Sequence, residues 1–355
     1  METENFSGMT EDTGGTVNTV SAADIIGENF SPEGAPPAAS KQEVKRNANF
    51  TIGGGLLYLG IMYAVIFAWM IVDMIVYTIH HAGEETETII ADYTEKAMSS
   101  GVSSIASIAV GIGFMFLFFR KKVTPNTLFA DRKPMSVPVF FKILCIFMMG
   151  QLLATLGNML LEFILNCFGL TASAGMEALE NLDSSLSMVL YAGIFGPIAE
   201  ELMFRGFIMR GLEKHGKLYA IVISSLLFGL FHSNIVQIPF AAVVGLVFAY
   251  TAMEYGIKWS ILLHIFNNLV FALGLGWLTD GMSEGMTTLI ELGAEGIFFI
   301  LGVIFVITER RKIADFFRSN RTVKPRYRWA FTTPCFIIFT VLTLALGLIF
   351  ISKLA

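Results

Sequence analysis

The sequence predicts an all-α, polytopic transmembrane bundle of about eight to nine helices. Hydrophobic residues make up 54% of the 355 residues and charged residues only 15%, whereas soluble domains usually carry about 25% charged residues. The apolar residues fall into separate runs, most of them about 18 residues long or longer, and a helix of that length can cross a bilayer. This composition is not that of a soluble enzyme, and we expect no nucleic-acid partner. The expected partner is the lipid bilayer in which the helices lie.

Nine apolar runs follow one another along the chain. The first contains Asp73, the second stops at the basic triplet 120–122, and the fourth carries three charged residues. The fifth and sixth are short for membrane spans. The predicted helices cover about 56–77, 102–119, 139–163, 186–209, 218–233, 238–255, 259–278, 293–308 and 331–351.

The first 50 residues differ from the rest in composition. They are polar and acidic and are rich in Gly, Ser, Thr and Pro, a composition typical of disorder. They show no basic segment followed by an apolar one, so no cleaved signal peptide is expected. We expect four parts along the chain: a disordered acidic tail, N-terminal membrane helices, a helical core that carries the charged residues of the fourth run, and C-terminal membrane helices with a basic cytoplasmic loop; these are 1–50, 51–180, 181–280 and 281–355.

Charged residues in the loops predict the orientation. Lysine and arginine cluster before the first helix and in every second loop after it, and the intervening loops are mostly acidic. Because basic loops stay in the cytoplasm, we expect a cytoplasmic N-terminus and, with nine helices, an external C-terminus. Other polar residues inside the runs are expected to bond between helices or to reach the membrane surface; these are Asp73, Lys142, Gln151, Asn158 and Glu162.

Three charged residues within six positions mark the fourth helix. Glu200, Glu201 and Arg205 lie in an otherwise apolar run, although one charge at mid-bilayer costs roughly 2.5–3.5 kcal/mol. Glu201 and Arg205 are four residues apart, so they share a helix face and can form a buried ion pair. Glu200 points about 100° away from Glu201. It can therefore face a different cavity and act as a general base.

Two later helices supply imidazoles and a carboxamide. His232 shares a face with Phe228, whose ring limits rotation of the imidazole, and His264 shares a face with Asn268. Histidine and asparagine N–H groups are suitable donors to an oxyanion. Glu200 and His264 fall at similar depths in the predicted topology, whereas His232 falls toward the external side. Either its helix begins later than Leu218 or the site lies close to the middle of the membrane.

The sequence leaves a metal site open. Glu200, His232 and His264 could hold zinc, which acidifies its bound water. The His-Glu-x-x-His pattern of many zinc peptidases is absent, and asparagine is a poor zinc ligand, so metal-free water activation is favoured. The cysteines Cys145, Cys167 and Cys335 are far apart and support neither a disulfide framework nor a structural zinc site.

The three motifs resemble those of a known family in order and residue type. Glu200-Glu201-xxx-Arg205, Phe228-xxx-His232 and His264-xxx-Asn268 are similar to the motifs of the CAAX-protease and bacteriocin-processing family. Its members are intramembrane endopeptidases, also called type II CAAX prenyl endopeptidases or lysostaphin-resistance-A-like proteins. The resemblance covers about residues 186–275.

The resemblance implies a role for each motif residue. Glu200 and His232 would activate water, His264 and Asn268 would stabilise the oxyanion, and Glu201 and Arg205 would support them. A peptidase inside the bundle would then cut a membrane-associated protein or peptide, possibly a CAAX-type substrate or a bacteriocin or leader peptide.

We therefore expect a multi-pass protein of a bacterial plasma membrane. Two alternatives remain open: a catalytically silent immunity or scaffold protein of the same fold, and an ion-coupled or proton-coupled transporter. The transporter predicts inverted repeats and broken helices, and Gly196-Pro197 is the one place where the fourth helix could break.

Overall fold

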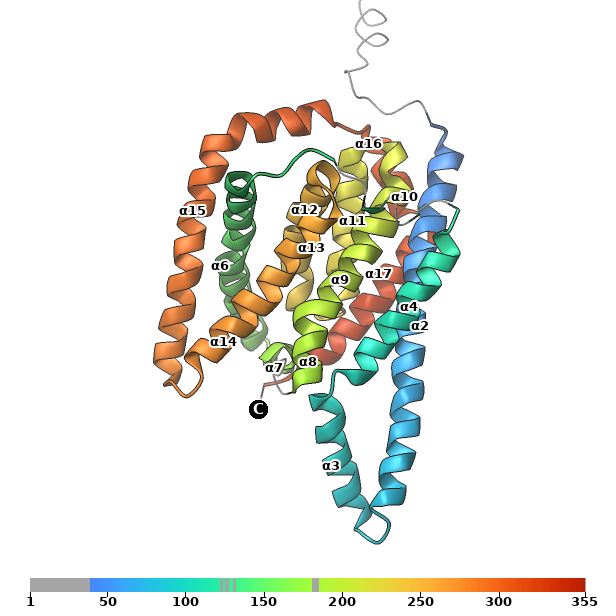
Figure 1. Cartoon of the computed structure of the whole chain (residues 1–355), viewed down its shortest axis with the longest axis vertical. Helices are drawn as coiled ribbons and strands as arrows, with labels where there is room; N and C mark the ends of the chain where they lie inside the picture. Colours follow the sequence, from blue (N-terminus) through green and yellow to red (C-terminus); the bar gives the residue numbers. More distant parts are fainter. Residues whose placement is uncertain (1–38, 122–123, 125–127, 130–131, 181–184, 355) are drawn as a thin grey trace, which may run out of the picture.

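The described part of the chain is an all-α bundle, so the predicted fold class is confirmed. The computed structural model describes residues 39–121, 124, 128–129, 132–180 and 185–354. Helices dominate these ranges (Figure 1), and the strands found there are only the antiparallel pair β1 (Leu170–Thr171) and β2 (Ser352–Lys353). The predicted disorder of the first residues lies outside the described residues up to position 38.

Within the described residues, seven helical segments are long and apolar enough to cross a membrane. They agree with predicted runs but extend beyond several of them, because polar residues at helix ends continue the hydrogen-bonded backbone past the apolar part. The segments are α2 (Lys41–His80), α4 (Val102–Phe119), α6 (Val137–Cys167), the run Leu186–His215, α12 (Gln237–Tyr255), the run Ile257–Thr279 and α15 (Glu284–Ser319).

The other two predicted spans differ from regular membrane helices. The fifth is α11 (Lys217–Phe231), whose 15 residues are too few for a full span. The ninth is bent by 65° between α16 (Lys324–Phe331) and the segment Pro334–Phe350, which begins with α17 (Pro334–Gly347). Counting this pair as one span gives up to eight in the described chain.

Two long runs contain π-helical turns. The run Leu186–His215 consists of α8 (Leu186–Leu190), η2 (Tyr191–Phe195), α9 (Gly196–Glu201), η3 (Leu202–Met209), α10 (Arg210–Leu212) and η4 (Glu213–His215), of which η2 and η3 are π-helical. The run Ile257–Thr279 consists of α13 (Ile257–Ile265), the π-helical η5 (Phe266–Leu273) and α14 (Gly274–Thr279). Gly196-Pro197 therefore does not break the fourth helix, as the transporter alternative would require. Instead, a π-helical turn directly precedes it.

The first helix begins earlier than the composition indicated. It starts at Lys41, where the side chain of Ser40 accepts a hydrogen bond from the backbone N–H of Glu43. This capping contact extends the helix back into the stretch that the sequence assigned to the acidic tail. The polar residues at its start therefore belong to the helix.

Two short helices had no counterpart among the predicted elements: α3 (Thr86–Ser99) and α7 (Ser173–Glu180). Helix α3 packs along the second half of α2, and this hairpin projects beyond the rest of the bundle (Figure 1). The hydroxyl of Tyr93 donates to the carbonyl of Met70, and Lys96 lies 3.4 Å from Asp73. The intramembrane Asp73 thus has an interhelical partner, as expected for a polar residue inside a span.

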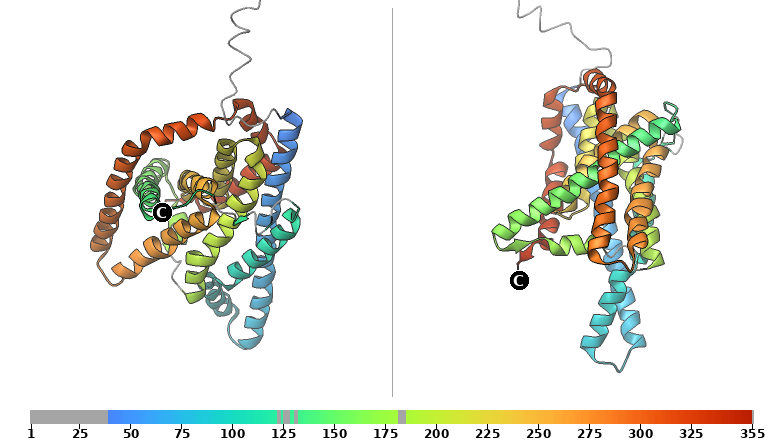
Figure 2. Two further views of the ribbon diagram at one scale, coloured as in Figure 1. Left: turned by 45° about the horizontal axis from the view of Figure 1, so that its top comes forward. Right: turned by 90° about the vertical axis from the view of Figure 1, so that its left-hand side faces the viewer.

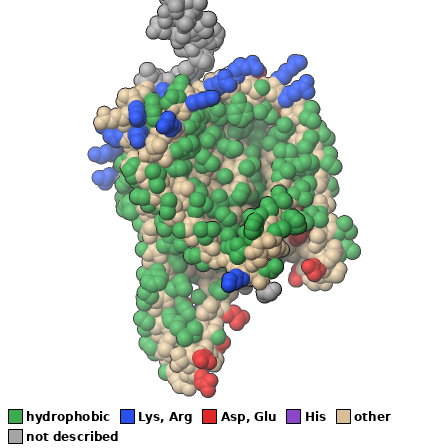
Figure 3. Space-filling view, turned by 180° about the vertical axis from the view of Figure 1, so that it is seen from behind, with side chains coloured by type: hydrophobic (Ala, Val, Ile, Leu, Met, Phe, Trp, Pro, Cys, Tyr) green, Lys and Arg blue, Asp and Glu red, His purple; other side chains and the backbone are tan. Residues whose placement is uncertain are grey.

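The segments run in alternate directions through the bundle (Figure 1), so the start of α2 and the C-terminal end lie at opposite ends. Lysine and arginine side chains gather at the end where α2 begins, and most of the visible acidic side chains lie toward the other end (Figure 3). The separation of basic from acidic loops that the sequence indicated is therefore also present in the folded protein. It supports the expectation that the α2 end faces the cytoplasm.

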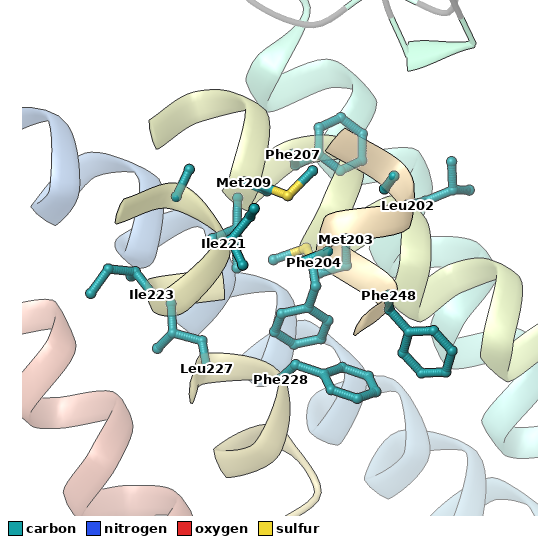
Figure 4. Close-up of a cluster of buried hydrophobic side chains, with 14 of the residues drawn as sticks. Leu202, Met203, Phe204, Phe207, Met209, Ile221, Ile223, Leu227, Phe228 and Phe248 are labelled. Atoms are coloured by element: carbon teal, nitrogen blue, oxygen red, sulfur yellow. The ribbon is translucent and has the colours of Figure 1, made fainter. Parts of the chain in front are cut away.

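The core lies between the helices that carry the three motifs. Side chains of η3 pack against α11 (Figure 4), and the rings of Phe204 and Phe228 meet edge to face at 5.4 Å. The hydroxyl of Ser224 donates to the carbonyl of Phe204 at 2.8 Å. In contrast, α15 is largely exposed and packs mainly on α6, which crosses it at a steep tilt (Figure 2).

Candidate active site

One internal cavity brings together residues of all three motifs. It has a volume of about 370 Å³ and is lined by Glu200, His232, His264 and Asn268, with Asn267 beside them. Apolar side chains from α2, α11 and α12 complete its wall. The remaining predicted site residues, Glu201 and Arg205, do not line the cavity but lie buried behind it.

The depth conflict predicted for His232 does not arise. The fourth helical run continues to His215, and α11 begins at Lys217 after the single residue Gly216. Gly216 has a φ of 126°, which favours glycine and permits this tight reversal. Glu200 and His232 are equally far along the chain from Gly216, so the two antiparallel helices carry them to the same level.

Behind the cavity lies the predicted ion pair. Nη1 of Arg205 is 2.9 Å from Oε1 of Glu201, and both side chains are 0% exposed. The other carboxylate oxygen of Glu201 accepts a hydrogen bond from the hydroxyl of Ser260. Nη2 of Arg205 donates to the carbonyl of Gly245 at 3.2 Å. Opposite charge and these hydrogen bonds together offset much of the cost of burying the two groups.

Two aromatic rings flank the guanidinium of Arg205. Its central carbon lies 4.2 Å from the ring centroid of Phe228 and 5.2 Å from that of Phe248. The face of an aromatic ring attracts a cation, most strongly where water is excluded. Phe228 belongs to the second motif, but nothing in the sequence singled out Phe248.

His264 links the buried pair to the cavity. Its Nδ1 lies 3.0 Å from Oε1 of Glu201, and its Nε2 lies 3.7 Å from Oε2 of Glu200. The ring stacks on Phe248 with centroids 4.5 Å apart and planes at 24°. Because a carboxylate only accepts hydrogen bonds, Nδ1 carries a proton. In the neutral ring, Nε2 is then the unprotonated atom and faces the cavity carboxylate.

A backbone carbonyl fixes the orientation of His232. Nδ1 of the ring lies 2.8 Å from the carbonyl oxygen of Phe228, so this nitrogen donates. The ring of Phe228 meets the imidazole edge to face at 4.9 Å, as its place one turn earlier indicated. Nε2 is left as the acceptor of the neutral ring, in a side chain that lines the same cavity as Glu200.

A chain of amide hydrogen bonds fixes Asn268. Gln151 on α6 donates to Oδ1 of Asn267, whose Nδ2 donates to Oδ1 of Asn268 at 2.9 Å. Nδ2 of Asn268 in turn donates to the carbonyl of Ala192 at 2.9 Å. An amide nitrogen has two N–H groups, so this contact uses one of them and leaves one for the cavity.

Sequence reasoning missed three of these supporting residues. Gln151 was noted only as a polar residue inside a span, and Ser260 and Asn267 were not noted. Asn267 directly precedes the motif asparagine, and Ser260 lies one turn before His264, so spacing offered a weak signal for both. For Gln151 no signal existed, because its partner lies on a helix far away in sequence.

The ring nitrogens and carboxylates of the motif residues are the atoms that would bind a metal ion. Among the described residues, no three His, Cys, Asp or Glu side chains are grouped so that they could hold a metal ion together. Nδ1 of His264 and Nδ1 of His232 are both turned to protein acceptors. These Nδ1 contacts leave both Nε2 atoms available and are compatible with metal-ligating histidines, so the zinc site at Glu200, His232 and His264 remains a prediction.

Comparison with known proteins identifies the segment that contains this site. Residues 182–270 match the family model described as type II CAAX prenyl endopeptidase Rce1-like. The match includes all three motifs and agrees with the family that they resemble. Searches of curated proteins and of solved structures gave no significant match.

Proposed function

We propose that this membrane protein is an intramembrane endopeptidase, because residues 182–270 match the family model of Rce1-like type II CAAX prenyl endopeptidases. Its substrate is a membrane-associated protein or peptide, and the reaction is hydrolysis of one peptide bond by an activated water. The observation that carries the proposal is the convergence of three motifs, from separate helices, on one cavity.

Glu200 is the general base in this proposal. Its side chain is 20% exposed, whereas that of neighbouring Glu201 is 0% exposed and held by Arg205. Glu200 therefore remains available to a water in the cavity. His232 presents an unprotonated Nε2 toward the same space and can accept a hydrogen bond from that water. Together the two groups orient the water and take its proton as it attacks the carbonyl carbon.

The oxyanion is stabilised from the other side of the cavity. Asn268 offers its second amide N–H, in an orientation that the amide chain fixes. His264 offers Nε2–H once it carries a proton on both nitrogens, and Glu201 beside Nδ1 offsets the resulting positive charge. Donors that are fixed before the reaction stabilise developing charge most effectively. The proton that Glu200 takes from water passes to the nitrogen of the leaving amine as the C–N bond breaks.

The decisive test compares membrane proteomes of cells that produce the wild type or Glu200→Gln at equal levels. New peptide N-termini present only with the wild type identify the cleavage sites, because the glutamine variant keeps the shape and loses the base. The matched control is Glu84→Gln, which alters an exposed carboxylate outside the motifs. Cleavage by Glu84→Gln and none by Glu200→Gln is the expected result.

The two alternatives predict other outcomes. A silent immunity or scaffold protein gives no peptides that depend on the wild type. A transporter gives none either, and its transport activity would depend on the same carboxylate. Cleavage that persists in Glu200→Gln would remove this residue from the mechanism even if the chain is a peptidase.

A further inference from the structure

A second hollow, distant from the catalytic cavity, lies where the beginning of α2 meets α16. One cavity of about 690 Å³ is lined by Lys41, Lys45, Lys324 and Arg328 together with Trp329. A second cavity of about 580 Å³ shares Lys41 and Lys45 and adds Arg46. We call the two together the basic groove. Its basic side chains come from opposite ends of the sequence, so the fold assembles the groove.

The described chain forms no close ion pair with the cations of the basic groove. No ion pair joins Lys41, Lys45, Arg46, Lys324 or Arg328 to a described carboxylate. The acid nearest in sequence, Glu43, forms its ion pair with Lys214, at 3.0 Å, and interacts with Arg46 only beyond ion-pair distance. Gathering like charges in one hollow is unfavourable unless an anion offsets them. A negatively charged ligand bound in the basic groove would offset this repulsion.

The position of the basic groove indicates that it lies at the membrane surface. Helix α2 becomes apolar soon after Arg46, and the 65° bend before α17 sets α16 at an angle to the following span. Trp329, Pro325 and Pro334 line the hollows beside the cations. Tryptophan is typical of the layer where headgroups meet acyl chains. The lining thus offers charge to a headgroup and apolar surface to the start of its chains.

We propose that the basic groove binds the phosphate headgroup of an anionic phospholipid. Basic pockets between helices on the cytoplasmic side are suited to such headgroups, and each nearby Lys or Arg contributes about 1 kcal/mol to the attraction. The first 38 residues, with seven acidic and no basic residues, are the rival occupant. The lipid is favoured because carboxylates of the tail would satisfy the cations but not the apolar part of the lining.

The test measures thermal unfolding of the purified full chain in detergent. Phosphatidylglycerol is added to the micelles in one arm, phosphatidylcholine in a second, and soluble glycerol phosphate in a third. We expect phosphatidylglycerol alone to raise Tm, by about 2–4 °C, because it binds the folded state. An equal rise with glycerol phosphate would identify a site for soluble anions and overturn the lipid proposal.

Charge-matched triple variants localise the effect. Three groove cations are replaced in one variant, and three exposed cations outside the groove are replaced in the other. The first should lose the phosphatidylglycerol shift, with affinity lower by about tenfold or more, and the second should keep it. Equal losses would mean unspecific surface attraction and overturn the proposal. The variants are Lys45→Gln with Lys324→Gln and Arg328→Gln, and Arg310→Gln with Arg311→Gln and Arg321→Gln.

A further variant tests the tail. All seven acidic residues among the first 38 are changed to their amides in the full chain. If the lipid is the occupant, both this variant and the wild type show the phosphatidylglycerol shift. If only the tail variant responds, the tail fills the groove of the wild type and the proposal is wrong.

Discussion

Nδ2 of Asn268 lies 2.9 Å from the carbonyl oxygen of Ala192, on the helix that carries the glutamate pair. In the π-helical turn η2, the N–H of Gly196 bonds to the carbonyl of Tyr191, five residues earlier. The next bond of this kind would join residue 197 to Ala192, but Pro197 has no N–H. The proline therefore leaves this carbonyl free to hold the asparagine side chain.

Pro197→Ala should lower the rate of peptide cleavage by about tenfold, because a new N–H competes with Asn268 for the carbonyl of Ala192 and loosens one oxyanion donor. Helix stability should not fall, since alanine suits a helix better than proline. Initial rates and Tm are measured together. The control is Pro138→Ala in the first turn of α6, which is exposed. An unchanged rate would show that the carbonyl contact does not position Asn268.

Gln151→Leu should reduce activity about three- to tenfold, because Asn267 loses the donor that anchors it and Asn268 can then turn over. The matched control is Thr155→Val, one turn further along α6, whose hydroxyl bonds to Glu295 and not to the site. In a double-mutant cycle, Gln151→Leu should add little to Asn268→Ala. Fully additive losses would mean that Gln151 acts on the reaction by another route.

The sequence predicted the helices and the shared face of Glu201 and Arg205 well because both signals are local. Apolar length marks a span, and four-residue spacing places Arg205 one turn from Glu201. The contacts between helices had no such signal. The stacking of Phe248 on His264 and the reach of Gln151 to Asn267 depend on which helices pack together.

The errors of the sequence analysis also have physical causes. The depth of His232 was misjudged because polar residues lengthen the fourth helix to His215, beyond its apolar run. Gly196-Pro197 was considered a possible helix break, whereas the helical run Leu186–His215 continues through it and a π-helical turn directly precedes it. Helix α3 is not apolar and therefore escaped a search for membrane spans.

Arg205→Ala should strongly destabilise the protein. It leaves the fully buried Glu201 without its cation, and breaking a buried pair by removing one partner costs roughly 3–5 kcal/mol. Glu200→Gln is the matched variant, because it removes a charge from the adjacent residue, which faces the cavity. Thermal unfolding in detergent compares the two. Equal Tm values for Arg205→Ala and the wild type would contradict the buried pair.

Labelling of single cysteines tests the orientation. In a background without Cys145, Cys167 and Cys335, a cysteine at Ser352 should react with an impermeant reagent added to intact cells. A cysteine at Lys214 should react only after the cells are permeabilised. Both positions are exposed, and they lie near opposite ends of the bundle. The reverse pattern would place the α2 end and the basic groove outside the cell.

Activity should survive removal of divalent metals. Among the described residues, no three His, Cys, Asp or Glu side chains are grouped so that they could hold a metal ion. In the proposed hydrolysis, Glu200 and His232 activate the water without a metal ion, so a chelator should not lower the rate. Metal analysis of the purified protein is combined with cleavage assays before and after chelation. Zinc in a one-to-one ratio, with activity lost to the chelator and restored by zinc alone, would make His264 a ligand instead of an oxyanion donor.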